Sequence, residues 1–93
     1  MSNYNEHMTN EARLICDNEY SIYMQLREFS KSCKTENNSL DELNDLVWEL
    51  KVNQIVFNTI PALDYVKGSD FDPGQVDVKS LAFDLYQYHV NEH

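Results

Sequence analysis

The chain has few of the residues that interrupt regular structure, with only two glycines and two prolines among 93 residues. An all-β sandwich or barrel needs many turns and therefore many turn residues, so this scarcity argues against both. No apolar run approaches the roughly 20 residues that span a bilayer, and we expect no membrane insertion. Because 42% of the residues are hydrophobic and 12% are aromatic, we expect a folded domain and not a disordered chain.

Cysteine is also scarce, and Cys16 and Cys33 are the only two. Residues 1–10 are polar and lack the apolar stretch of a secretion signal, which predicts a cytoplasmic, reducing environment. On one continuous helix the two thiols would lie about 25 Å apart, beyond the reach of a disulfide. We therefore predict buried free thiols, with a redox or intermolecular role as the alternative.

Basic residues are outnumbered, with seven Lys and Arg against sixteen Asp and Glu and a formal net charge of -9. Between Lys34 and Lys51 there is no base, whereas five acids fall there: Glu36, Asp41, Glu42, Asp45 and Glu49. Such a charge repels nucleic acid and anionic lipid surfaces and attracts the basic surfaces of proteins that hold nucleic acid. We expect a protein partner, with no direct contact to nucleic acid or membrane.

The first half of the chain predicts a polar, flexible arm over residues 1–8 and a helix over 9–34. Apolar side chains in the helix recur at spacings of seven, four, three and four, at Ile15, Ile22, Leu26, Phe29 and Cys33. Asp17 and Asn18 are the weak point of this helix, because both residue types favour caps and turns over helix interiors. A break at this step would divide the helix into a short and a long piece.

A second helix is predicted over residues 39–58, and Ser39 with Glu42 forms a capping box at its start. One side carries apolar residues, which we expect to face the core: Leu40, Leu43, Leu46, Val47 and Leu50. The other side carries Asp41, Asp45 and Glu49. The β-branched residues from Val52 to Val56 weaken helix propensity, so a short buried strand is the alternative there.

The last third of the chain predicts two shorter helices around one loop. A helix over 61–67 begins at Pro61 and is closed by Gly68, and the loop over 69–75 turns at Pro73-Gly74. Asp77 caps a final helix over 78–91. The whole of residues 1–93 is therefore predicted to be one small all-α domain, a bundle of about four helices.

No set of residues in this sequence spells out a reaction, and we predict neither a cofactor nor a metal. Asp70 and Asp72 resemble the start of a calcium loop, but the positions that need glycine and glutamate hold Gln75 and Leu81. The cysteines and histidines never reach the paired spacing of a zinc site. His89 lies on the apolar side of the last helix and is expected to be packed there. The protein is predicted not to be an enzyme, and a small hydrolase or transferase is the alternative.

The candidate site is therefore an acidic surface. Asp41, Asp45 and Glu49 stand four residues apart, in a row with about 6 Å of rise between neighbours, and Glu42 lies beside them. We expect Asp70 and Asp72 to extend this surface and Trp48 to be a half-exposed anchor, because tryptophan is common at interfaces. An ordinary solvated helix face is the alternative.

Two stretches resemble a family of small uncharacterised proteins carried by phages and other mobile elements. Asn3-Tyr4 matches the opening of that family, residues 15–19 with Tyr23 resemble its middle step, and Val76-Asp77 resembles its closing step. The tryptophan typical of the family is missing, and residues 54–75 are added length. The resemblance covers about half of the chain, and it implies a mobile-element origin and an all-α fold without a known active site.

Small acidic proteins of such origin are similar in character to inhibitors of bacterial defence, such as anti-CRISPR and anti-restriction proteins. Charge and resemblance together predict an inhibitor that binds the basic DNA- or RNA-handling surface of a host defence complex, such as a CRISPR effector. The alternative is a homodimeric structural or regulatory adaptor in which the acids only confer solubility. Either a monomer or a homodimer fits the sequence.

Overall fold

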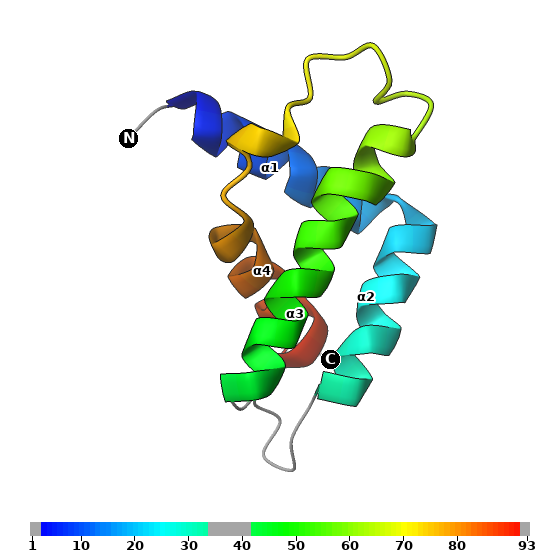
Figure 1. Cartoon of the computed structure of the whole chain (residues 1–93). Coiled ribbons are helices and arrows are strands. Elements are labelled where there is room, and N and C mark those ends of the chain that lie inside the picture. Colours follow the sequence, from blue (N-terminus) through cyan, green and yellow to red (C-terminus); the bar gives the residue numbers. More distant parts are fainter. Residues whose placement is uncertain (1–2, 34–41, 92–93) are drawn as a thin grey trace.

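The computed structural model describes residues 3–33 and 42–91, and helices dominate this part of the chain (Figure 1). The four α-helices are α1 (Asn3–Asn18), α2 (Tyr20–Cys33), α3 (Glu42–Gln54) and α4 (Val78–Tyr86). Two π-helical turns, η1 (Ile55–Thr59) and η4 (Gln87–Asn91), continue α3 and α4, and two short 3-10 turns are η2 (Ile60–Ala62) and η3 (Pro73–Gln75). Residues 3–33 and 42–91 contain no strand, so the predicted all-α fold class is confirmed.

Helix α3 lies at the centre of the arrangement and contacts both α2 and α4. Helix α1 lies across these elements and packs against α2 and α4, while η3 reaches back to α1 (Figure 1). No helix is apolar enough to be covered on all sides by the others. Each one therefore has a buried stripe and a surface open to solvent.

The break between α1 and α2 falls where the sequence is weakest. Helix α1 ends at Asn18 and α2 begins at Tyr20, so residues 9–34 do not form one continuous helix. Hydrogen bonds still cross the bend, because the Glu19 amide donates to the Ile15 carbonyl and the Tyr23 amide donates to the Glu19 carbonyl, both at 2.9 Å. The bend turns α1 across the bundle while the chain remains helical on either side.

The prediction of a flexible arm over residues 1–8 is wrong for residues 3–8. These residues form the first turns of α1, and Met8 is buried with 3% of its surface exposed. The Asp77 amide donates to Thr9 Oγ1 at 2.9 Å, which ties α1 to the start of α4. The polar composition of residues 3–8 gave no sign of this docking, because Met8 is the buried apolar side chain that the segment supplies to the core.

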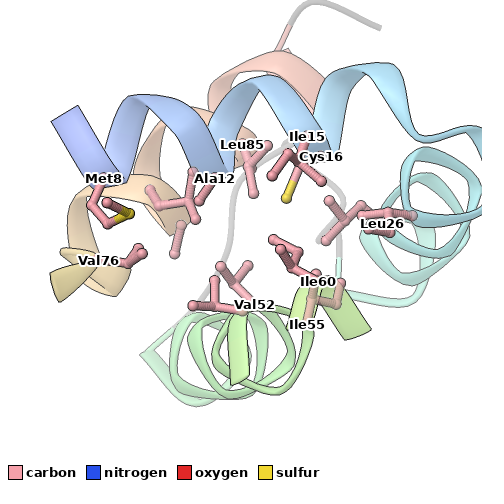
Figure 2. Packing of buried hydrophobic residues seen from close by; sticks show 14 of the residues in the cluster. Met8, Ala12, Ile15, Cys16, Leu26, Val52, Ile55, Ile60, Val76 and Leu85 are labelled. Carbon is pink, nitrogen blue, oxygen red and sulfur yellow. The ribbon is translucent and has the colours of Figure 1, made fainter. Parts of the chain in front are cut away.

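The core is one cluster that draws on α1, α2, α3, α4 and the turns between α3 and α4 (Figure 2). Its most deeply buried large side chains are Trp48, Ile22, Leu26, Ile55, Ile60, Leu81, Leu85, Val52 and Val56. Helix α3 with η1 supplies four of them at the spacing i, i+4, i+7 and i+8, which is the pattern of one buried helix stripe. The alternative of a buried strand near Val52 is therefore wrong.

The remaining predicted elements are confirmed in part. Helix α4 with η4 covers the predicted helix from Val78 to Asn91, and the Asp77 carboxylate caps it by accepting from the Ser80 amide at 3.2 Å. The predicted helix over 61–67 is wrong, because the chain forms η2 and then a turn over 64–68. Gly68 closes that turn with φ +80, a left-handed conformation that favours glycine. The predicted cap at Ser39 lies outside the described residues.

Candidate functional site

Trp48 fixes which side of α3 faces the core. Its side chain is 1% exposed, and its Nε1 donates a 2.8 Å hydrogen bond to the carbonyl oxygen of Ala82 on α4. The indole stacks on Phe29 of α2 at 6.2 Å between ring centres and meets His89 edge-on at 6.4 Å. The prediction of Trp48 as a half-exposed anchor is therefore wrong, because its polar N–H finds a partner inside the protein.

Two of the predicted acids lie on the surface of α3 as expected. Asp45 is exposed and Glu49, four residues later, is partly exposed, so their carboxylates are one turn apart with about 6 Å of rise. Among the described side chains, ion pairs join Arg13 to Asp84 and Lys31 to Glu28, and neither pair involves Asp45 or Glu49. These two carboxylates therefore form an acidic edge along α3, and no ion pair with a described base involves either of them.

The other predicted acids do not join this edge. Asp41 and the side chain of Glu42 lie outside the described residues. Asp70 and Asp72 belong to the segment between η2 and η3, which Figure 1 shows as a loop beyond the C-terminal end of α3, whereas Asp45 belongs to the N-terminal part of this helix. The carboxylate of Asp72 is used by its own turn, where it accepts from the Gly74 amide at 3.0 Å. The prediction that Asp70 and Asp72 extend the acidic surface of α3 is therefore wrong.

An apolar stripe on α3 and η1 is exposed, contrary to the prediction that Leu46, Val47 and Leu50 face the core. Leu40 and the side chain of Leu43, which belong to the same prediction, lie outside the described residues. The members of the stripe are Leu46 at 60% exposure, Leu50 at 65%, Phe57 at 46% and Val47 at 37%, and we refer to these four residues as the α3 stripe. Leu46 and Leu50 each stand two residues from Trp48, which is about 200° around the helix axis. Phe57 stands in the same relation to Ile55. The stripe therefore lies on the side of the helix opposite the core.

Leu46 and Leu50 were predicted to face the core because they form an apolar stripe at helical spacing, but α3 with η1 carries two such stripes. A second set at Trp48, Val52, Ile55 and Val56 has the same helical spacing and was the available signal. Both sets consist of apolar side chains, so composition alone does not show which of them is buried. The set with the tryptophan is the one that meets α2 and α4.

A small pocket lies between α1 and the turn before η3. Its volume is about 260 Å³, and its lining includes His7, Glu11, Tyr65, Asp70 and Phe71. Within residues 3–33 and 42–91, no group of three His, Cys, Asp or Glu side chains is arranged to hold a metal ion. Asp70, one of the predicted site residues, therefore borders this pocket.

Both cysteines and His89 are packed inside the protein. Burial raises the pKa of the Cys16 thiol from its ordinary value of 9.0 to about 12, and the neighbouring Asp17 carboxylate adds to the rise. Cys33 is also buried. His89 is 4% exposed and lies among aromatic rings, with Tyr88 at 5.1 Å and Tyr23 at 5.2 Å. The prediction that His89 is a packed side chain is confirmed.

No protein-family model matches the chain, and neither a curated protein nor a solved structure matches it. The resemblance to small phage and mobile-element proteins therefore stays a prediction. None of the helices within residues 3–33 and 42–91 has the length and apolar character needed to cross a bilayer.

Proposed function

We propose that this protein inhibits a nucleic-acid defence complex of a host cell, such as a CRISPR effector, by binding its basic DNA- or RNA-handling surface. The observation that carries the proposal is the acidic edge of α3. Asp45 and Glu49 lie one turn apart in a stretch without any base between Lys34 and Lys51, on a chain of net charge -9. A phage or mobile-element origin is part of the same proposal and rests on the partial resemblance of the sequence.

The physical basis is electrostatic. Carboxylates along one helix edge present negative charge to the lysines and arginines that would otherwise contact phosphates. Like charges four residues apart cost a helix a few tenths of a kcal/mol per pair, so a pair of acids that forms no ion pair with a described base favours a role in binding. Association through such an edge is fast and sensitive to salt.

Charge reversal on the edge tests the proposal. The D45K/E49K variant should lose inhibition of DNA binding by a purified CRISPR effector with its guide, measured by gel shift over a range of salt concentrations. The control E28K/D64K makes the same change in net charge at two exposed residues away from the edge and should retain most of the inhibition. Equal inhibition by both variants, or none by the native protein across a panel of such complexes, would contradict the proposal.

A second candidate function is a homodimeric adaptor, and the exposed α3 stripe favours it. Large apolar side chains in contiguous exposed positions often mark an interface. Sedimentation equilibrium at low protein concentration separates the two functions, because an adaptor of this kind is dimeric before any partner is added.

A further inference from the structure

The α3 stripe is a three-turn apolar surface that no described part of the fold covers. Leu46, Leu50 and Phe57 follow one another at spacings of four and seven, which is one side of a helix, and they span about 16 Å along the axis. Each of the three keeps between 46% and 65% of its surface exposed. Val47 widens the stripe near its start. Anchors at this spacing are those with which helices pack on one another.

The acidic edge borders this stripe on one side. Asp45 immediately precedes Leu46, and Glu49 immediately precedes Leu50, so each acid lies about 100° around the axis from its leucine. The opposite side of the stripe has Lys51, whose Nζ is directed to the Phe29 ring at 5.7 Å from its centre. A partner that covers the stripe therefore meets negative charge along one edge only.

We propose that the α3 stripe with its acidic edge docks an amphipathic helix of the partner protein, apolar along one face and edged with lysine or arginine. The inference deepens the proposed function and rests on it, since it names the chemistry of the partner surface. Apolar contact supplies most of the affinity, and the carboxylates of Asp45 and Glu49 select basic partners and set the orientation. In this inference Leu50 and Phe57, instead of the predicted Trp48, are the side chains that anchor the partner helix.

Charge complementarity disfavours a second copy of this chain as the occupant. Another copy brings a further charge of -9 and its own acidic edge. Lys51 is the only base on α3, and it already lies over Phe29. Two copies joined through this face would therefore place four carboxylates at the rim of one interface, whereas a basic helix neutralises the edge as it covers the stripe.

Designed peptides provide the probe. One peptide has leucines along one helix face and lysines beside them, a second has the same composition in an order that spreads the leucines around the helix, and a third has glutamate in place of lysine. Each is labelled and titrated with the full chain in a fluorescence anisotropy assay. We expect the first peptide to bind at least about tenfold more tightly than the other two. NMR mapping on the native chain should locate its contacts at α3 and η1.

Matched variants identify the surface. L50S/F57S removes two anchors and should weaken binding of the first peptide by about tenfold or more. The control L14S/F83S removes a leucine and a phenylalanine that are similarly exposed elsewhere, at 57% and 62%, and it should bind the peptide as the native chain does. Circular dichroism checks that every variant folds. The D45K/E49K variant should bind the first peptide more weakly than the native chain does, and the difference should be largest at low salt.

Three results would overturn the inference. The first is that the native chain binds the first two peptides equally well. The second is that L50S/F57S binds the first peptide as tightly as the native chain does. The third is that the native chain is a dimer and the L50S/F57S substitutions dissociate it. If L50S/F57S binds the first peptide as the native chain does while D45K/E49K loses inhibition, the docking role of the α3 stripe is wrong and the proposed function stands. Retained inhibition in D45K/E49K, with peptide binding still dependent on Leu50 and Phe57, would overturn the proposed function and the selection of basic partners together.

Discussion

The indole Nε1 of Trp48 donates a 2.8 Å hydrogen bond to the Ala82 carbonyl oxygen, which joins the middle of α3 to α4. This bond holds the tryptophan inside the bundle with 1% of its surface exposed. Leu46 and Leu50 lie on the opposite side of the same helix and face solvent. The side of α3 that meets the core therefore decides which of its residues form the surface on which both functional proposals depend.

The Trp48→Phe substitution should lower the free energy of unfolding by about 2 to 3 kcal/mol. The ring contacts with Phe29 and His89 are largely kept, but the hydrogen bond to Ala82 is lost and the smaller ring leaves unfilled volume. Urea denaturation followed by circular dichroism measures the change. Tyr20→Phe, at a side chain that is 73% exposed, is the control and should change stability by less than about 0.5 kcal/mol. A loss no greater than that of the control would show that the bond contributes little.

The Thr9→Val substitution tests whether α1 is fixed to α4 by a side chain. Valine keeps the shape of threonine but removes Oγ1, which accepts from the Asp77 amide at 2.9 Å. We expect the free energy of unfolding to fall by about 1 to 2 kcal/mol, since a partly buried donor loses its partner. Thr9→Ser keeps the hydroxyl and should cost less, and a larger loss for serine than for valine would contradict this account.

The Gly68→Ala substitution should lower the free energy of unfolding by about 1 kcal/mol, through backbone strain alone. The residue has φ +80, and an added Cβ would find no heavy atom within 4 Å, so no steric clash contributes. Gly68→Asn should be milder, because asparagine tolerates the left-handed region better than alanine. Thermal unfolding of the three proteins ranks them, and equal stability of glycine and alanine would exclude strain at this turn.

The Cys16 thiol should make the protein less stable as the pH rises above 9. Unfolded chains release this proton near the ordinary pKa of 9.0, whereas the folded protein keeps it until about 12. Between these values the unfolded state binds fewer protons, so the free energy of unfolding falls as pH rises, by at most about 1.4 kcal/mol per pH unit. Below pH 9 the thiol is protonated in both states, and its contribution to the free energy of unfolding is fully present.

Cys16→Ala is the control for this pH dependence. It lowers stability at every pH by removing a buried side chain, but it should flatten the decline above pH 9 because the titrating group is gone. Urea denaturation of both proteins at several alkaline pH values gives the two slopes. Identical slopes would mean that the buried thiol does not take part.

Local signals in the sequence located several elements because short-range chemistry decides them. Asp17 and Asn18 predicted the bend between α1 and α2, Asp77 predicted the start of α4, and Pro73 predicted the turn at η3. At the start of α4 the Asp77 side chain acts on the backbone within three residues, because its carboxylate accepts from the Ser80 amide. The predicted helix over 61–67 failed since a proline and a closing glycine fit a short turn as well as a helix.

The candidate site was predicted only in part. Asp45 lies on the surface and Glu49 is partly exposed, as their spacing predicted, because charged side chains avoid a core of this kind. Trp48 was predicted to be a half-exposed anchor, but a hydrogen-bond acceptor 34 residues away in sequence lets it be buried. No pattern within α3 reveals that acceptor.

By itself the sequence determined the helical class, the negative charge and the residues that share each side of a helix, since these depend on composition and on a period of 3.6 residues. Only the tertiary structure decided which of two apolar stripes on α3 is buried. The stripe that contains Trp48 and Val52 meets α2 and α4, so Leu46, Leu50 and Phe57 are left exposed beside the acids. Periodicity groups side chains along one helix, whereas burial also requires a neighbouring surface that other helices supply.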